Sequence, residues 1–140
     1  MKKGFTLIEL LVVIAIIAML SSLSVVALNS ARAKSRDARR LSDIKQIRTA
    51  LEMYYDNNQT YPTSTSGTLG AGSLACLNSS SFTTAGCTGT VYMQIVPKDP
   101  LPTRNYTYAP VGSGAGYTIA YTLENGGAAT ATPESIGYGN

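Results

Sequence analysis

The sequence predicts an α+β protein in which one long N-terminal α-helix, half transmembrane and half amphipathic, packs on a small antiparallel β-sheet of about three strands. Three observations lead to this fold class. An apolar run fills residues 5–28, neither Gly nor Pro occurs in residues 5–60, and residues 117–123 alternate between apolar and polar side chains. The first two patterns predict a continuous helix, and the third predicts a strand with one buried face.

The apolar run predicts a helix of about 36 Å, which is long enough to cross a bilayer. Lys2 and Lys3 precede it, and Glu9 lies inside it. A carboxylate in the apolar layer costs roughly 2 to 3 kcal/mol, so a plain anchor would be better without it. A secretory signal peptide is a simpler interpretation, but the run lacks a good signal peptidase site after it. A single-pass anchor with an incidental Glu9 is the other alternative.

Residues 4–17, Gly-Phe-Thr-Leu-Ile-Glu-Leu-Leu-Val-Val-Ile-Ala-Ile-Ile, resemble the processing site and N-terminal helix of type IV prepilins and type II secretion pseudopilins. The resemblance implies a leader peptide of residues 1–4, cleavage by prepilin peptidase between Gly4 and Phe5, and N-methylation of Phe5. It further implies that Glu9 pairs with the positive N-terminus of a neighbouring subunit during assembly. A subunit held in lipid would gain that pairing only by joining a filament.

Residues 29–57 are predicted to continue the helix as an amphipathic stalk. Leu41, Ile44, Ile47 and Leu51 recur every three or four residues, which predicts the face on which the sheet packs. Residues 29–40 are too polar for a core and carry a basic cluster: Arg32, Lys34, Arg36, Arg39 and Arg40. Three interpretations of this cluster stay open: a solvated helical face, contacts with acidic groups of neighbouring subunits or lipid phosphates, and nucleic-acid binding.

Residues 58–103 are predicted to form a connecting loop. Residues 57–97 carry no charged side chain, and Ser, Thr and Gly supply eighteen of the thirty residues 61–90. Cys76 and Cys87 are predicted to form a disulfide because they follow an export or membrane segment, with two free buried thiols as the alternative. Two Cys without any His are too few for a zinc site.

Residues 104–140 are predicted to hold the sheet and a C-terminal tail. Tyr106 and Tyr108 share one face of a first strand, residues 117–123 form the second, and residues 128–132 form a weaker third strand after the Asn-Gly-Gly turn at 125–127. The tyrosines are interpreted as core residues rather than as a ligand platform.

No cofactor is predicted. The major pseudopilins that the chain resembles bind calcium through acidic loops, whereas Asp99, Glu124, Asn125 and Glu134 stand here without an Asp-rich loop. Calcium is therefore not favoured, and the missing acidic loop points toward a pilus-like head. An enzyme is not predicted either, because the chain has no His and its carboxylates are scattered without a spaced pair.

The expected function is that of a structural subunit of a type IV pilus-like or type II secretion pseudopilus filament. The resemblance implies several partners: identical or related pilin subunits, prepilin peptidase, an inner-membrane assembly platform with its ATPase, and membrane lipid. Nucleic acid is not among the expected partners. It also implies a place in the inner membrane before assembly, with the head outside the cytoplasm, and an extracellular or periplasmic filament afterwards. A membrane-anchored surface binding protein that never polymerises is the alternative.

Overall fold

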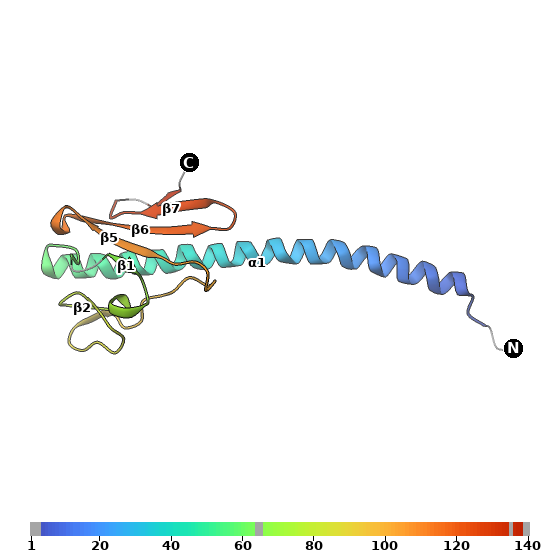
Figure 1. Cartoon of the computed structure of the whole chain (residues 1–140), viewed down its shortest axis with the longest axis horizontal. Coiled ribbons are helices and arrows are strands. Elements are labelled where there is room, and N and C mark those ends of the chain that lie inside the picture. The colour runs from blue at the N-terminus through green and yellow to red at the C-terminus, as the bar shows by residue number, and fades with distance from the viewer. Residues whose placement is uncertain (1–3, 64–65, 135, 139–140) are drawn as a thin grey trace. The chain divides into compact units, whose positions relative to one another are not determined.

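A computed structural model describes residues 4–63, 66–134 and 136–138. The chain divides into two compact units, Met1–Ser35 and Arg36–Asn140. One helix, α1 (Leu7–Asn58), forms most of the first unit and continues into the second (Figure 1). The predicted continuous helix is confirmed. It ends where Gln59 turns to a left-handed φ of 54° and its amide donates to the carbonyl of Tyr55, a typical helix C-terminus.

The second unit, the head, contains two antiparallel sheets. The larger has the strand order β1-β5-β6-β7-β8, and the smaller has the order β3-β2-β4. The larger sheet consists of β1 (Gly67–Thr68), β5 (Thr107–Val111), β6 (Gly116–Leu123), β7 (Gly127–Ala131) and β8 (Ile136–Tyr138). The smaller consists of β2 (Cys76–Asn78), β3 (Phe82–Thr83) and β4 (Val91–Met93), and two 3-10 turns span Gly72–Leu74 and Gly112–Gly114.

The α+β class is confirmed, but the expected number of about three strands is wrong. The part of the chain that the structure describes holds eight strands, five of them in the larger sheet. The missed strands have only two or three residues, which is too short for an alternating pattern to show. The alternation at residues 104–108 predicted a first strand that starts at Arg104, whereas β5 starts at Thr107, because the Arg104 amide closes a turn by donating to the carbonyl of Leu101.

The core of the head forms where the sheets meet residues 36–58 of α1. Ile44, Ile47 and Leu51 are buried in one cluster with Tyr108 and Ile119, as the helical stripe predicts. Figure 1 shows β5 and β6 running alongside this part of the helix. The tyrosine rings pack against one another: Tyr61–Tyr117 ring centroids lie 4.8 Å apart and Tyr108–Tyr117 centroids 5.9 Å apart. The core interpretation of Tyr106, Tyr108, Tyr117 and Tyr121 is confirmed.

The segment predicted as a connecting loop contributes to this core. Leu69, Leu74, Leu77, Phe82 and Val96 are all buried in the same cluster. Its Ser, Thr and Gly content predicted a segment without a core of its own, and the structure shows how such a segment becomes ordered. It supplies single apolar side chains to a core that the helix and the larger sheet provide.

Candidate functional site

The expected processing site, Gly4 and Phe5, precedes the first turn of α1. Both residues are exposed, and Phe5 has a relative exposure of 80%. A Cβ atom placed on Gly4 would meet no other atom within 4 Å, and its φ is not in the left-handed region. Within the described part of the chain, neither packing nor a left-handed backbone therefore accounts for a glycine at this position.

Glu9 is part of the N-terminal cap of α1. Its Oε2 accepts hydrogen bonds from the backbone N–H of Thr6 at 2.8 Å and from the Thr6 hydroxyl at 2.6 Å, while the Glu9 amide donates to Thr6 Oγ1 at 3.3 Å. This reciprocal arrangement is a capping box. The sequence interpretation left Glu9 without a partner outside a filament, and missed that the Thr-x-x-Glu spacing at residues 6–9 signals this cap.

The apolar residues that follow Glu9 cover the whole circumference of the helix and are exposed. An 18-residue window of α1 has a mean hydropathy of 2.8, and none of it is buried within the chain. Every large apolar side chain of residues 7–28 is about half exposed or more. A helix of this kind is long and apolar enough to cross a membrane, and it offers a surface on which other helices can pack.

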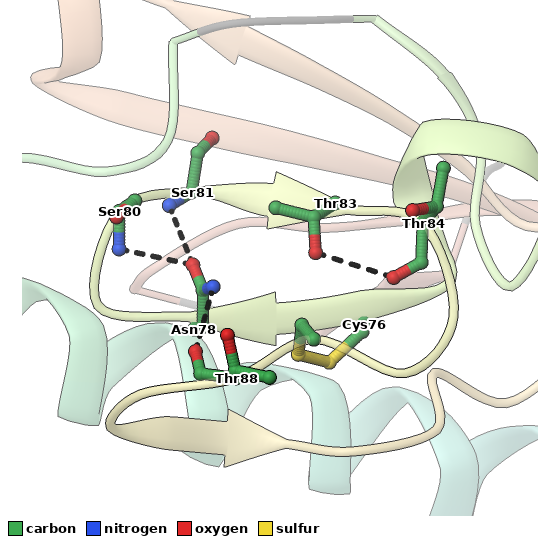
Figure 2. The surroundings of a disulfide bond; sticks show 8 residues. Cys76, Asn78, Ser80, Ser81, Thr83, Thr84 and Thr88 are labelled. Carbon is green, nitrogen blue, oxygen red and sulfur yellow. Dashed lines mark hydrogen bonds between the residues drawn. A yellow bond between two sulfur atoms is a disulfide. The ribbon is translucent and has the colours of Figure 1, made fainter.

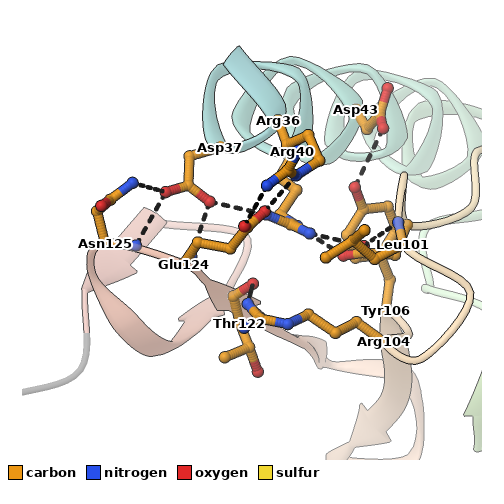
Figure 3. A network of polar contacts seen from close by, with 11 residues as sticks. Arg36, Asp37, Arg40, Asp43, Leu101, Arg104, Tyr106, Thr122, Glu124 and Asn125 are labelled. Carbon is orange, nitrogen blue, oxygen red and sulfur yellow. Dashed lines mark hydrogen bonds and ion pairs between the residues drawn. The ribbon is translucent and has the colours of Figure 1, made fainter. Parts of the chain in front are cut away.

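Two arginines of the predicted basic cluster fold into the head (Figure 3). Arg40 donates from Nε and Nη2 to the two carboxylate oxygens of Asp99 at 2.7 and 2.8 Å, and from Nη1 to Asp37 and Glu124 at 2.8 Å each. Arg36 donates to both oxygens of Glu124 at 2.7 and 2.6 Å. The side chains of Arg40 and Asp99 are fully buried. We call Arg36, Asp37, Arg40, Asp99 and Glu124 the ion-pair hub.

The ion-pair hub joins three segments of the head through complementary charges. Hydrogen bonds from Arg36, and next those from Arg40, lower the pKa of Glu124 to about 2. Burial alone would raise the pKa of Asp99, but the hydrogen bonds from Arg40 and from the Leu101 amide hold it below its ordinary value. Burial would also raise the pKa of Asp37, but hydrogen bonds from the Glu124 amide, from Asn125 and from Arg40 hold it below its ordinary value. All three carboxylates are therefore ionised at neutral pH, and each charge-assisted bond is of the strong kind.

This arrangement corrects the interpretation of the basic cluster. A solvated face, or contacts with partners outside the chain, does not describe Arg36 or Arg40, because both bind carboxylates of their own head. Residues 29–40 were judged too polar for a core, yet Arg40 has no exposed surface. Only Asp37, three positions away, could have been paired with Arg40 from a local helical pattern, since Asp99 and Glu124 lie 59 and 84 positions away.

Three of the four residues considered for calcium bind other groups of the head. Asp99 and Glu124 bind the two arginines, and the Asn125 side chain donates to Asp37 at 3.0 Å. Glu134 is exposed. Among the residues that the structure describes, no group of three or more His, Cys, Asp or Glu side chains is placed to hold a metal ion.

Cys76 and Cys87 form the predicted disulfide (Figure 2). It joins the buried Cys76 of β2 to the chain that returns toward β4. Asn78 braces the same region: its side-chain oxygen accepts from the amides of Ser80 and Ser81 at 3.0 and 3.1 Å, and its Nδ2 donates to the carbonyl of Thr88 at 3.2 Å. The bridge and Asn78 together hold residues 78–88 against β2.

An apolar N-terminal helix that begins with a capped carboxylate, and continues into an α+β head, defines a pilin-like protein. The family comparison agrees. Residues 1–25 match the model described as the prokaryotic N-terminal methylation motif, and residues 26–135 match the model of type II secretion system protein G. The chain belongs to the type II secretion system protein G family.

Curated relatives agree with this assignment. The type II secretion system core protein G of Escherichia coli (strain K12) is 42% identical over 66 residues, 47% of this chain and 46% of that protein. The protein of the same name from Aeromonas hydrophila is 41% identical over 66 residues, with the same shares. The type IV major fimbrial protein FimA of Dichelobacter nodosus is 42% identical over 52 residues, 37% of this chain and 33% of FimA.

The aligned part of the chain spans about half the length of the core G proteins it matches. No solved structure matches the chain. The missing acidic loop was taken to point toward a pilus-like head, whereas the family match places the chain with the secretion proteins.

Proposed function

We propose that the chain is a non-enzymatic structural subunit that polymerises through its N-terminal helix into a type II secretion pseudopilus or a related type IV pilus-like filament. Prepilin peptidase would cleave between Gly4 and Phe5, and the new amine of Phe5 would be N-methylated. Before assembly the helix would lie in the inner membrane with the head outside the cytoplasm. Afterwards the subunit would be part of a periplasmic or extracellular filament, built from identical or related subunits by an inner-membrane platform and its ATPase.

The observation that carries the proposal is that, among the described residues, the Glu9 carboxylate is bound only by donors of Thr6. The Thr6 cap offers its carboxylate two neutral donors but no positive charge. Bonds from these neutral donors leave the net negative charge of Glu9 in the lipid uncompensated, whereas a cationic amine would both donate a hydrogen bond and neutralise that charge. A methylated amine keeps its positive charge, so Phe5 of a neighbouring subunit would supply the cation that the Thr6 cap lacks.

The cap survives processing, which makes the two roles of Glu9 separable. The Thr6 amide belongs to the Phe5–Thr6 peptide bond, so cleavage before Phe5 leaves both Thr6 donors in place. Glu9→Gln keeps a side chain that can complete a capping box but removes the charge. Thr6→Ala removes the hydroxyl donor and keeps the charge.

The test is filament formation in cells that carry the secretion machinery, with membrane levels of each variant measured in parallel. We expect Glu9→Gln and Glu9→Ala to abolish filaments at normal membrane levels, and Thr6→Ala to retain them. Filaments in Glu9→Gln cells would show that the charge is not required. If wild-type cells formed no filaments, and the Glu9 variants kept wild-type surface levels and ligand binding, the results would instead support a non-polymerising, membrane-anchored binding protein.

A further inference from the structure

The five residues of the basic cluster divide into two that are neutralised within the head and three that are exposed; of the exposed residues, Arg39 belongs to the head, and Arg32 and Lys34 are nearest to the apolar run. Arg36 and Arg40 are neutralised inside the head by the ion-pair hub. Arg32 and Lys34, in the first unit, are exposed and form no ion pair within the described part of the chain. No Asp or Glu occurs between Glu9 and Asp37. This short segment of the helix therefore carries two uncompensated positive charges.

The position of these charges along the helix matches the polar layer of a bilayer. Leu28 is the last residue of the apolar run. At a rise of about 1.5 Å per residue, Arg32 lies about 6 Å and Lys34 about 9 Å beyond it. The headgroup region extends about 5–8 Å beyond each face of the hydrocarbon core. When the apolar run spans the core, the long side chains of Arg32 and Lys34 reach lipid phosphates.

A neighbouring copy of the chain is a poorer source of negative charge. Eight Asp and Glu residues occur in the sequence. Asp37, Asp99 and Glu124 are ion-paired in the hub. Asp43 and Glu52 accept hydrogen bonds from buried tyrosines of the head, and the proposed function assigns Glu9 to the N-terminus of a neighbouring subunit. Only Asp56 and Glu134 remain. They are outnumbered by the exposed cations that form no ion pair within the described residues, such as Arg32, Lys34, Arg39 and Lys45. Packing copies together would also bring like charges close to each other.

We infer that Arg32 and Lys34 form a binding site for anionic phospholipid headgroups, which holds the unassembled subunit at the membrane surface. The inference rests on the proposed function, since it requires the apolar run to lie in the membrane. Two cations next to an anionic surface give a preference of roughly thirtyfold for anionic over zwitterionic lipid. Entry into a filament breaks these contacts, so lipid charge sets part of the barrier to extraction.

The experiment uses the full chain in neutral detergent micelles, with equimolar phosphatidylglycerol and phosphatidylcholine and native mass spectrometry of the bound lipid. We expect phosphatidylglycerol to dominate the adducts of the wild-type chain by about thirtyfold. The double variant Arg32→Gln/Lys34→Gln should bind the two lipids about equally. The matched control is Lys45→Gln, an exposed lysine on the same helix but far from the apolar run, which should keep the wild-type preference.

Equal binding of the two lipids by the wild-type chain would overturn the inference, and so would an unchanged preference in the double variant. Displacement of phosphatidylglycerol by an equal concentration of soluble glycerol phosphate would also overturn it, because the site would then recognise free phosphate rather than a lipid surface. None of these results depends on filament formation. A failed lipid test with normal Glu9-dependent filaments would leave the proposed function standing.

Discussion

Removal of the Arg40 guanidinium is the most informative perturbation of the head. Arg40→Met keeps most of the side-chain volume and deletes four hydrogen bonds of 2.7 to 2.8 Å. Glu124 would keep Arg36, and Asp37 would keep the Asn125 side chain and two backbone amides. Asp99 would lose its only cation in the ion-pair hub while fully buried.

The expected cost follows from that one stranded carboxylate. Breaking a buried ion pair by removing one partner costs about 3–5 kcal/mol, and the partners that Asp37 and Glu124 retain place Arg40→Met near 3 kcal/mol. For a domain of roughly 100 residues this lowers Tm by about 12 °C or more. Asp99→Asn in the Arg40→Met background removes the stranded charge, so it should recover part of the loss.

The assay is thermal unfolding of the full chain in detergent, followed by the near-ultraviolet circular dichroism of its nine tyrosines, since no Trp contributes. Arg39→Met is the matched control, because Arg39 is adjacent on the helix, exposed and without an ion pair in the described part of the chain. Its Tm should stay within about 2 °C of wild type. If Arg40→Met had the same Tm as the Arg39→Met control, the argument that the ion-pair hub stabilises the head would be refuted.

Three further predictions concern the head. The lowered pKa of Glu124, about 2 against an ordinary 4.5, contributes stability that is present above about pH 4.5 and lost as the pH falls toward 2; Glu124→Gln should flatten this acid limb of the Tm profile, and an equally steep limb would contradict the ion pairing. Cys87→Ser should lower the free energy of unfolding by about 2–3 kcal/mol, and a reducing agent should reproduce the loss in wild type but add nothing to the variant. Gly114→Ala should cost more than Gly86→Ala, because both glycines have positive φ but only at Gly114 does a Cβ collide with Thr60; equal costs in chemical denaturation would rule out the collision.

The sequence was sufficient for features set by local patterns. The helix follows from an unbroken run without Gly or Pro, the buried stripe from Ile44, Ile47 and Leu51, and the main strand from the alternation at residues 117–123. Each of these depends on residues a few positions apart, whose preference for a helix or strand period is readable directly. The disulfide was predictable because the only two cysteines follow a segment typical of export or membrane insertion, which favours an oxidising compartment.

Features that depend on distant partners were missed. Nothing near Arg40 in sequence indicates that Asp99 and Glu124 will surround it, so a cluster of positive charge was taken for a surface. Strands β2 and β3 pack where the helix and the larger sheet provide a core to which Leu77 and Phe82 can add. The capping box at Thr6 and Glu9 was readable from local spacing, but it lay inside a motif already interpreted through assembly.

The central claim is that the chain is processed and then polymerised through its N-terminal helix. The most direct test is the intact mass of the protein extracted from the membranes of cells that contain prepilin peptidase. The account predicts a chain that has lost residues 1–4 and gained one methyl group on Phe5. A mass that retains Met1, or one that corresponds to cleavage after residue 20, would contradict it.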